Sequence, residues 1–283
     1  MKLNRKKSIR NSFSKALHIS AAAHPKIVLM SDCHRGCGTW ADSFLSNRPI
    51  YTAALKYYAQ KDFTYIELGD GDELWGNRKF ADIYRAHREV FQIFQLLAKE
   101  DRIFLLYGNH DREKEKGIHL KKDMPFFIPF YESLIVERLQ GPDLYLIHGY
   151  QGDFLNDKHW KLTRSLVRYI WKPLELRGIK DPTSAAKNYT KVREIEEAFI
   201  SFSCENHCIL AAGHTHKPTM MHTDCGMYFN SGSCVHPGAI TAIEIQETTS
   251  KATLVKWSVC SKKDMSLYVC RERLKEISIP KRL

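Results

Sequence analysis

The sequence of 283 residues contains no long apolar run. No stretch reaches the roughly 18 apolar residues that a membrane-spanning helix needs. The basic start "MKLNRKKSIR" is followed by "NSFSKALHIS", which lacks the apolar stretch of a secretory signal peptide. Sequence repeats and low-complexity tracts are also absent. These absences argue against a helical membrane protein and a repeat protein, and we expect a cytoplasmic protein.

Acidic residues are scarce in two parts of the chain. No Asp or Glu precedes Asp32, whereas seven Lys and Arg residues do. Between Lys158 and Arg193 there are ten basic residues and only two acidic ones. The whole chain carries 43 Lys and Arg against 32 Asp and Glu, a net charge of +11. This imbalance favours an anionic partner: nucleic acid, a membrane surface or a phosphorylated substrate.

The eight cysteines lack the compact spacing of a disulfide framework. Disulfide-rich domains are small and secreted, whereas this chain is long and expected in the cytoplasm. We therefore predict reduced, partly buried thiols.

Short apolar runs predict the strands of a layered α/β fold. Between the early runs lie helical patterns at 51–60 and 80–99, whereas the later runs follow each other as in an antiparallel sheet. Residues 156–203 interrupt this order and predict two or more helices. Lys161, Arg164, Arg168 and Lys172 form a basic stripe there, for which a solvated helix face is the simplest interpretation. The apolar runs are "KIVLMS", "FTYIEL", "RIFLLY", "DLYLIH", "HCILAA", "AITAIEI" and "ATLVKWSV".

Polar side chains follow five of these predicted strands. A single Asp or His after a strand is ordinarily a turn residue or a helix cap. Five such groups indicate a site, because ligands of open α/β sheets bind at the carboxyl ends of strands. The five blocks are Asp32-Cys33-His34, Gly69-Asp70, Gly108-Asn109-His110-Asp111, His148-Gly149 and Gly213-His214-Thr215-His216.

The residue types in these blocks suit metal ions. Asp32 and His34 are two residues apart, so in an extended segment both would point the same way, and the same holds for His214 and His216. Carboxylate, imidazole and amide ligands without thiolate suit Mn, Fe, Co or Zn. There are more candidate ligands than one ion needs, which predicts two ions that share a carboxylate.

The ordered set D-x-H, G-D, G-N-H-D, H and G-H-x-H resembles the calcineurin-like metallophosphoesterase superfamily. The resemblance implies a four-layer α/β/β/α sandwich at residues 26–283, a helical cap at about 156–203 and a basic extension at 1–25. It also implies two divalent ions, with Mn first among the candidates, and an anionic phosphorylated substrate. One ion would bind Asp32, His34, Asp70 and His216, and the other Asp70, Asn109, His148 and His214.

The resemblance further implies roles for residues beside the ligands. His110 would face the phosphoryl group and stabilise charge or protonate the leaving oxygen, and Asp111 would orient His110. Arg35 is a candidate phosphate contact, although a surface-loop arginine fits it equally well. Arg164 and Arg168 are candidate substrate contacts on the insert.

The order "IHGYQGD", helical insert, "GHTHKP" also resembles the UDP-2,3-diacylglucosamine pyrophosphatase branch, whose insert covers a lipid-linked nucleotide sugar. This chain has His110 where that branch usually has Arg. Three functions therefore stay open: a phosphoesterase acting on a small or lipid-linked substrate, a nuclease, and a non-catalytic protein that binds nucleic acid or membrane. Ile9, Phe13 and Leu17 could likewise form a membrane-surface helix or belong to a disordered tail.

Overall fold

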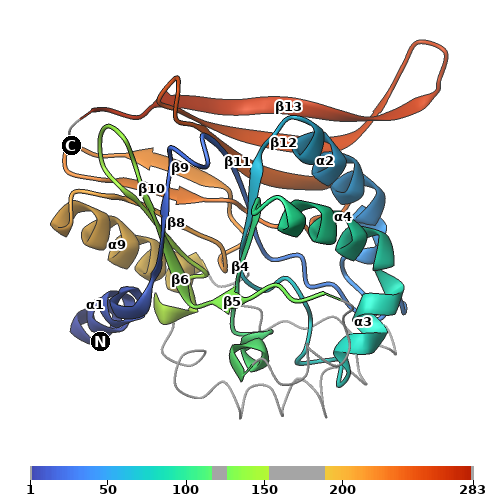
Figure 1. Cartoon of the computed structure of the whole chain (residues 1–283), viewed down its shortest axis with the longest axis horizontal. Coiled ribbons are helices and arrows are strands. Elements are labelled where there is room, and N and C mark those ends of the chain that lie inside the picture. Colours follow the sequence, from blue (N-terminus) through green and yellow to red (C-terminus); the bar gives the residue numbers. More distant parts are fainter. Residues whose placement is uncertain (1, 117–125, 153–188, 282–283) are drawn as a thin grey trace.

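The computed structural model describes residues 2–116, 126–152 and 189–281, in which two β-sheets pack face to face (Figure 1). The first sheet has seven strands in the order β13-β12-β11-β2-β3-β4-β5. The second has six in the order β1-β6-β7-β8-β10-β9. Helices cover the outer face of each sheet, so the predicted four-layer α/β sandwich is confirmed.

Parallel neighbours form the centre of each sheet. In the first sheet β2 (Lys26–Met30), β3 (Thr64–Leu68) and β4 (Ile103–Leu106) run parallel. In the second sheet β7 (Leu144–Ile147) and β8 (Ile209–Ala212) do the same. Their nearly continuous apolar sequences follow from burial on both faces.

The remaining strands complete the two sheets. β11 pairs antiparallel with both β2 and β12, and β12 pairs antiparallel with β13, so the predicted antiparallel section is confirmed. These strands are β1 (Leu17–Ser20), β5 (Phe130–Tyr131), β6 (Ser133–Glu137), β9 (Thr219–His222), β10 (Met227–Asn230), β11 (Ala239–Gln246), β12 (Lys251–Ser261) and β13 (Leu267–Ser278).

Helices α2 (Arg48–Gln60), α3 (Phe80–Ala86) and α4 (Arg88–Lys99) lie beside the first sheet. The single helix expected at 80–99 breaks at His87, whose Nε2 atom lies 2.9 Å from the Asp42 carboxylate. Helices α1 (Lys2–Ser12) and α9 (Tyr189–Glu205) lie beside the second sheet. Short 3-10 turns occupy Phe13–Lys15, Leu45–Asn47, Arg112–Lys116 and Tyr150–Gly152.

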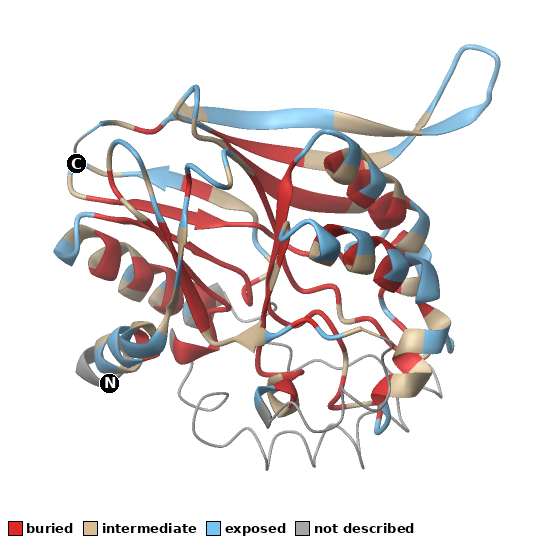
Figure 2. Ribbon diagram, in the orientation of Figure 1, coloured by how far each residue is buried: buried red, intermediate tan, exposed pale blue. Residues whose placement is uncertain are grey.

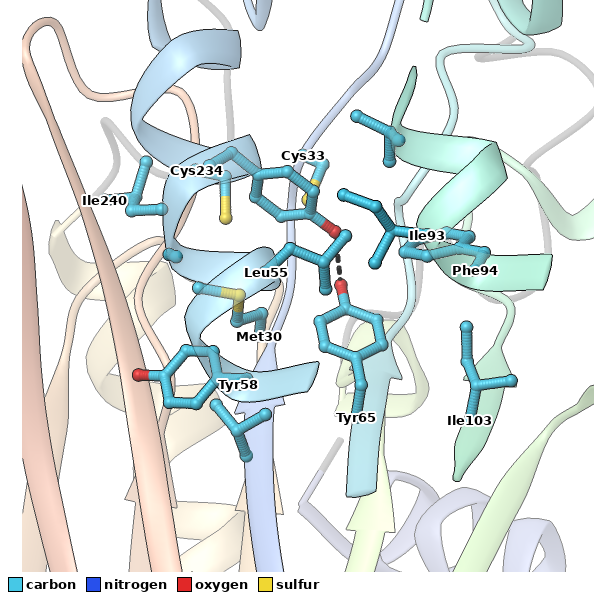
Figure 3. Close-up of a cluster of buried hydrophobic side chains, with 14 of the residues drawn as sticks. Met30, Cys33, Leu55, Tyr58, Tyr65, Ile93, Phe94, Ile103, Cys234 and Ile240 are labelled. Carbon is cyan, nitrogen blue, oxygen red and sulfur yellow. Dashed lines mark hydrogen bonds between the residues drawn. The ribbon is translucent and has the colours of Figure 1, made fainter. Parts of the chain in front are cut away.

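Alternation along the strands divides the core into layers, and Figure 2 shows the buried residues concentrated in the sheets. Val28 and Met30 of β2 face the helices, whereas Ile27 and Leu29 face the second sheet. On the helix side Tyr65 of β3 meets the helices, and its hydroxyl lies 2.6 Å from that of Tyr51 (Figure 3). The two faces of the first sheet are therefore both covered, which fixes the positions of its strand ends.

The N-terminal residues pack on the second sheet. β1 pairs with β6, and Ile9 is fully buried against Ile147 and Phe199. Phe13 stacks on Phe202. The apolar side of α1 is thus covered by the protein itself, which corrects the expectation that it faces a membrane or belongs to a disordered tail. None of the described helices combines the length and apolarity needed to cross a bilayer.

The expectation of reduced cysteines also needs correction. Disulfides join Cys204 to Cys225 and Cys260 to Cys270. The first links the end of α9 to the β9–β10 turn, and the second lies across the β12–β13 hairpin. Each pair of cysteines is brought together only when the chain folds, so the spacing of the cysteines in the sequence did not indicate the disulfides. Cys33, Cys37, Cys208 and Cys234 are free thiols.

Candidate metal centre

The polar strand ends of both sheets meet at one place. Asp32, Asp70 and Asn109 follow β2, β3 and β4 of the first sheet, whereas His148 and His214 follow β7 and β8 of the second. The site therefore lies where two sheets meet, and not along one sheet edge as the strand-end argument alone suggested. Potential ligand atoms lie within 4.8 Å of one another in three groups: Asp32, His34 and His216; Asp70, His148 and His214; and His34, Asp70 and His110.

Five of these residues have a left-handed backbone. The φ angles are 52° at Asp32, 47° at His34, 50° at Asp70, 67° at His214 and 57° at His216. Asp32-Cys33-His34 is thus not the extended segment assumed from the sequence. Non-glycine residues rarely adopt such angles, and backbone strain of this kind concentrates at functional sites.

Each aspartate has one oxygen anchored and the other directed at the imidazoles. The backbone N–H of His214 donates to Asp32 Oδ2 over 2.9 Å, and that of His110 donates to Asp70 Oδ1 over 2.8 Å. The remaining oxygens face the centre, where Asp32 Oδ1 lies 3.1 Å from His216 Nε2. Asp70 Oδ2 lies 3.2 Å from His148 Nε2 and 3.8 Å from His34 Nε2. Asp70 Oδ2 therefore lies between the two predicted ligand shells.

The imidazoles are also held in fixed orientations. His148 Nδ1 lies 2.7 Å from the carbonyl oxygen of Leu68, and His34 Nδ1 lies 3.1 Å from Glu73 Oε2. Since Nδ1 donates in such contacts, Nε2 is the ring nitrogen left to face the centre as a potential metal ligand.

Several buried atoms of the centre make no hydrogen bond among the described residues. They include His34 Nε2, Asn109 Oδ1 and Asp32 Oδ1. Buried polar atoms without a partner are rare because leaving one unsatisfied costs about 1–3 kcal/mol. All three belong to predicted metal ligands, and His34 Nε2 lies 3.9 Å from Asp32 Oδ1. The donor set of carboxylate, imidazole and amide therefore fits divalent ions such as Mn, Fe, Co or Zn.

The electrostatics of the centre favour cations. Burial by itself would raise the pKa of Asp32, but His216 and His148 hold it below its usual range. Burial would lower the pKa of His148, but Asp70 raises it to about 9. The two carboxylates thus create a negative potential that keeps positive charge beside them.

Gly108 and Gly213 let the loops after β4 and β8 approach the aspartates closely. A Cβ atom on Gly108 would collide with the Asp70 carboxylate, and one on Gly213 would collide with Ser31 and Asp32. Only glycine fits these positions without moving the candidate ligands.

Comparison with known proteins identifies the family. The sequence profile of the calcineurin-like phosphoesterases matches residues 25–218, which is more than half of the chain. The chain belongs to the calcineurin-like phosphoesterase family. As a calcineurin-like phosphoesterase, this protein is a hydrolase that acts on phosphoesters. No curated protein matches the sequence.

Solved structures with this phosphoesterase fold are only distantly similar. Yfce, a phosphoesterase from E. coli, shares 17% identity over 90% of this chain and 100% of its own, with a TM-score of 0.44. Vps29 from Chaetomium thermophilum shares 12% identity over 90% of this chain and 100% of its own, with a TM-score of 0.45.

Beside the candidate ligands of this phosphoesterase, Glu73 orients His110. Glu73 Oε2 lies 2.7 Å from His110 Nδ1, and the Trp75 ring stacks on His110 with centroids 4.0 Å apart. Burial would lower the pKa of His110, but Glu73 and then Asp70 raise it to about 9. Glu73 lies three residues after Asp70, and this closeness in the sequence was the available signal for its supporting role.

Asp111 does not orient His110, which corrects the role that the resemblance implied. Its Oδ1 accepts a hydrogen bond from the Gly108 backbone over 2.7 Å. Its Oδ2 accepts from the Gly71 backbone over 3.1 Å and from Lys114 Nζ over 2.9 Å. Asp111 therefore ties the loop after β4 to the loop after β3, and it acts on the site through the backbone.

Arg35 is buried and bound to carboxylates, so it is not the surface-loop arginine considered from the sequence, and no contact in the structure supports its candidate role toward phosphate. Its guanidinium is 1% exposed and binds both carboxylate oxygens of Glu67 over 2.7 and 2.9 Å. Arg35 Nε also donates to Asp72 over 2.7 Å. Burial would raise the pKa of Asp72, but Arg35 and Lys114 lower it to about 2. Arg35 thus neutralises buried carboxylates beneath the centre.

We expect Arg35→Ala to lower the free energy of unfolding by about 3–5 kcal/mol, because it leaves Glu67 buried without its charged partner and Asp72 paired with Lys114 alone. Urea denaturation measures this loss. The matched control is Arg85→Ala, because Arg85 pairs with Asp82 on the surface at 73% exposure and its loss should change stability by about 0.5 kcal/mol or less. If Arg35→Ala instead had normal stability and a greatly increased KM, Arg35 would be a substrate contact.

Arg164 and Arg168 lie outside the described residues. Their contact with an anionic substrate stays a prediction, as do the bounds of the cap at about 156–203. Of that segment the structure describes the part in α9, Tyr189–Glu205, and helix is found there as expected.

Proposed function

We propose that this phosphoesterase uses two divalent metal ions to hydrolyse a phosphodiester or diphosphate bond. The observation that carries the proposal is the convergence of buried ligand atoms without hydrogen bonds around Asp70 Oδ2. Asp70 would belong to both ligand shells. The remaining ligands would be Asp32, His34 and His216 for one ion and Asn109, His148 and His214 for the other.

The reaction needs three contributions from the chain's own residues. Divalent ions at the centre would polarise the phosphoryl group and activate water. His110 would donate a proton to the leaving oxygen, or stabilise charge on it, and Glu73 would hold the ring in position through Nδ1. Trp75 covers one face of that ring and restricts its rotation.

We propose an anionic substrate that is larger than a simple phosphate monoester. The support is the charge of the chain, +11, and the excess of basic residues between 158 and 193. A nucleotide-sugar or lipid-linked diphosphate fits both features and the order of the motif blocks. The same basic residues would also suit a nucleic-acid backbone, so a nuclease is the second candidate.

Metal analysis and a substrate panel test the proposal together. After loading with Mn²⁺ and removal of free metal, we expect two ions per chain by mass spectrometry of the dissolved metal. The loaded enzyme should hydrolyse bis-p-nitrophenyl phosphate, and the panel should add p-nitrophenyl phosphate, UDP-sugar diphosphates with and without acyl chains, and single-stranded DNA.

The panel separates the candidate substrates. Preference for an acylated UDP-sugar would support the lipid-linked diphosphate, whereas preference for DNA would support the nuclease. One ion per chain would contradict the two-metal centre. Two ions without hydrolysis of any substrate would contradict the proposed catalysis.

A further inference from the structure

The β12–β13 hairpin extends beyond the rest of the molecule. The two strands pair antiparallel from Lys251 opposite Ser278 to Ser261 opposite Leu267, and a short turn joins them. Figure 1 shows the far end of this hairpin, in red, projecting past α2, and Figure 2 shows it exposed. We call residues 259–268 the hairpin tip.

The hairpin tip carries large apolar side chains in contact with water. Met265 is 80% exposed, Leu267 72%, Val259 49% and Tyr268 45%. Apolar side chains at this exposure are ordinary when scattered singly, but a cluster of them marks an interaction site.

The register places these side chains on both faces of the hairpin. Val259 lies opposite Val269, and Ser261 lies opposite Leu267, so Val259 and Leu267 share the face that Trp257 turns toward α2. Tyr268 lies opposite Cys260 on the other face. A protein partner that covers one face would leave the other in water. A lipid bilayer surrounds an inserted tip on all sides and would cover both faces.

The charges at the hairpin tip are complementary to anionic lipid. Lys262 and Lys263 occupy the turn, and Lys262 Nζ lies 5.8 Å from the centre of the Tyr268 ring. The acidic residue of the turn, Asp264, accepts hydrogen bonds from the backbone N–H and the hydroxyl of Ser266 over 3.0 and 2.6 Å. The two lysines therefore lie beside exposed apolar side chains within a protein of net charge +11.

We propose that the hairpin tip inserts into the surface of an anionic lipid bilayer. Met265, Leu267 and Tyr268 would enter the boundary between head groups and acyl chains, and Lys262 and Lys263 would contact the head groups. The strand pairing and the Cys260–Cys270 disulfide already order the tip, so little conformational entropy is lost on insertion. The proposal is independent of the metal centre and of the substrate.

Vesicle sedimentation of the full chain tests the insertion. The vesicles contain phosphatidylcholine alone, or phosphatidylcholine mixed with phosphatidylglycerol. We expect the protein to sediment with the phosphatidylglycerol vesicles and to dissociate as salt is added, because salt screens the lysines. Lys262→Glu combined with Lys263→Glu should weaken this binding.

The decisive variant combines Met265→Ser with Leu267→Ser. Its partition coefficient should fall by at least about tenfold, equivalent to about 1.4 kcal/mol, because two apolar side chains no longer leave water. The matched control combines Leu96→Ser with Leu139→Ser, which are 58% and 65% exposed elsewhere on the surface, and it should bind normally. Unchanged hydrolysis of bis-p-nitrophenyl phosphate by the tip variant would show that its fold is intact.

Three results would overturn the proposal. The first is failure of the unaltered protein to bind phosphatidylglycerol vesicles. The second is equal binding by the tip variant and the control. The third is a dimer in analytical ultracentrifugation that the tip variant converts to a monomer without any vesicle binding, which would make the tip an interface between copies of this chain.

Discussion

Asp70→Asn should remove both metal ions and lower kcat/KM for bis-p-nitrophenyl phosphate by more than about 10²-fold. Changing a residue that only supports a metal ligand already lowers metal affinity or activity by about 10–100-fold. We expect a larger effect at Asp70, because it is itself a proposed ligand. Its Oδ2 atom faces His148 Nε2 at 3.2 Å and His34 Nε2 at 3.8 Å. Replacing the negatively charged carboxylate by a neutral amide weakens the attraction for both proposed ions. Metal content and kinetics on the same preparation measure the effect.

A surface aspartate provides the control for Asp70→Asn. Asp62 also has a left-handed backbone, with φ 61° against 50° at Asp70, but it lies exposed in the turn before β3. Asp62→Asn makes the same chemical change in the same backbone conformation and should retain metal and activity. If Asp70→Asn loses one ion and keeps the other, Asp70 is not shared between two sites.

Seven of the thirteen strands in the described residues could be predicted from the sequence, because burial on both faces demands apolar runs, whereas β1, β5, β6, β9, β10 and β13 were not predicted. All seven predicted runs are strands, including the parallel set that carries Asp32, Asp70 and Asn109. The edge strand β13 was missed because it is exposed and rich in charge, so its sequence resembles a solvated segment. The break at His87 was missed because no Pro or Gly marks it in the sequence, and the contact of His87 with Asp42 joins residues 45 positions apart.

The candidate ligands could be found because each follows a strand in a recognisable block. Their supporting contacts could not, because those depend on how the loops fold against each other. Asp111 is next to His110 in sequence, yet its carboxylate turns to Gly71 and Lys114, while Glu73 from another loop reaches the ring. Arg35 follows His34, yet it turns inward to Glu67. Adjacency in sequence was a poor guide to side-chain direction in loops with left-handed residues.

His110→Ala should lower kcat for diphenyl phosphate by about 10²–10⁴-fold while both metal ions stay bound, because this is the usual contribution of a positioned acid or base when the leaving group is poor. His222→Ala, at an exposed histidine of β9, is the matched control and should leave kcat unchanged. Glu73→Gln should cost less than His110→Ala, since Glu73 acts through the ring that it holds over 2.7 Å. In the double variant the combined loss should fall short of the sum of the two, because Glu73 then has only the His34 ring left to position.

The dependence on leaving group distinguishes proton donation by His110 from a role in positioning. A p-nitrophenolate leaving group is stable without a proton, whereas phenolate and alkoxide leaving groups benefit from one. If His110 donates the proton, the loss in His110→Ala should be small for bis-p-nitrophenyl phosphate and large for diphenyl phosphate. Equal losses for both substrates would instead show that the ring stabilises charge or positions the phosphoryl group. Loss of metal from His110→Ala would assign the ring to the ligand group that it forms with His34 and Asp70.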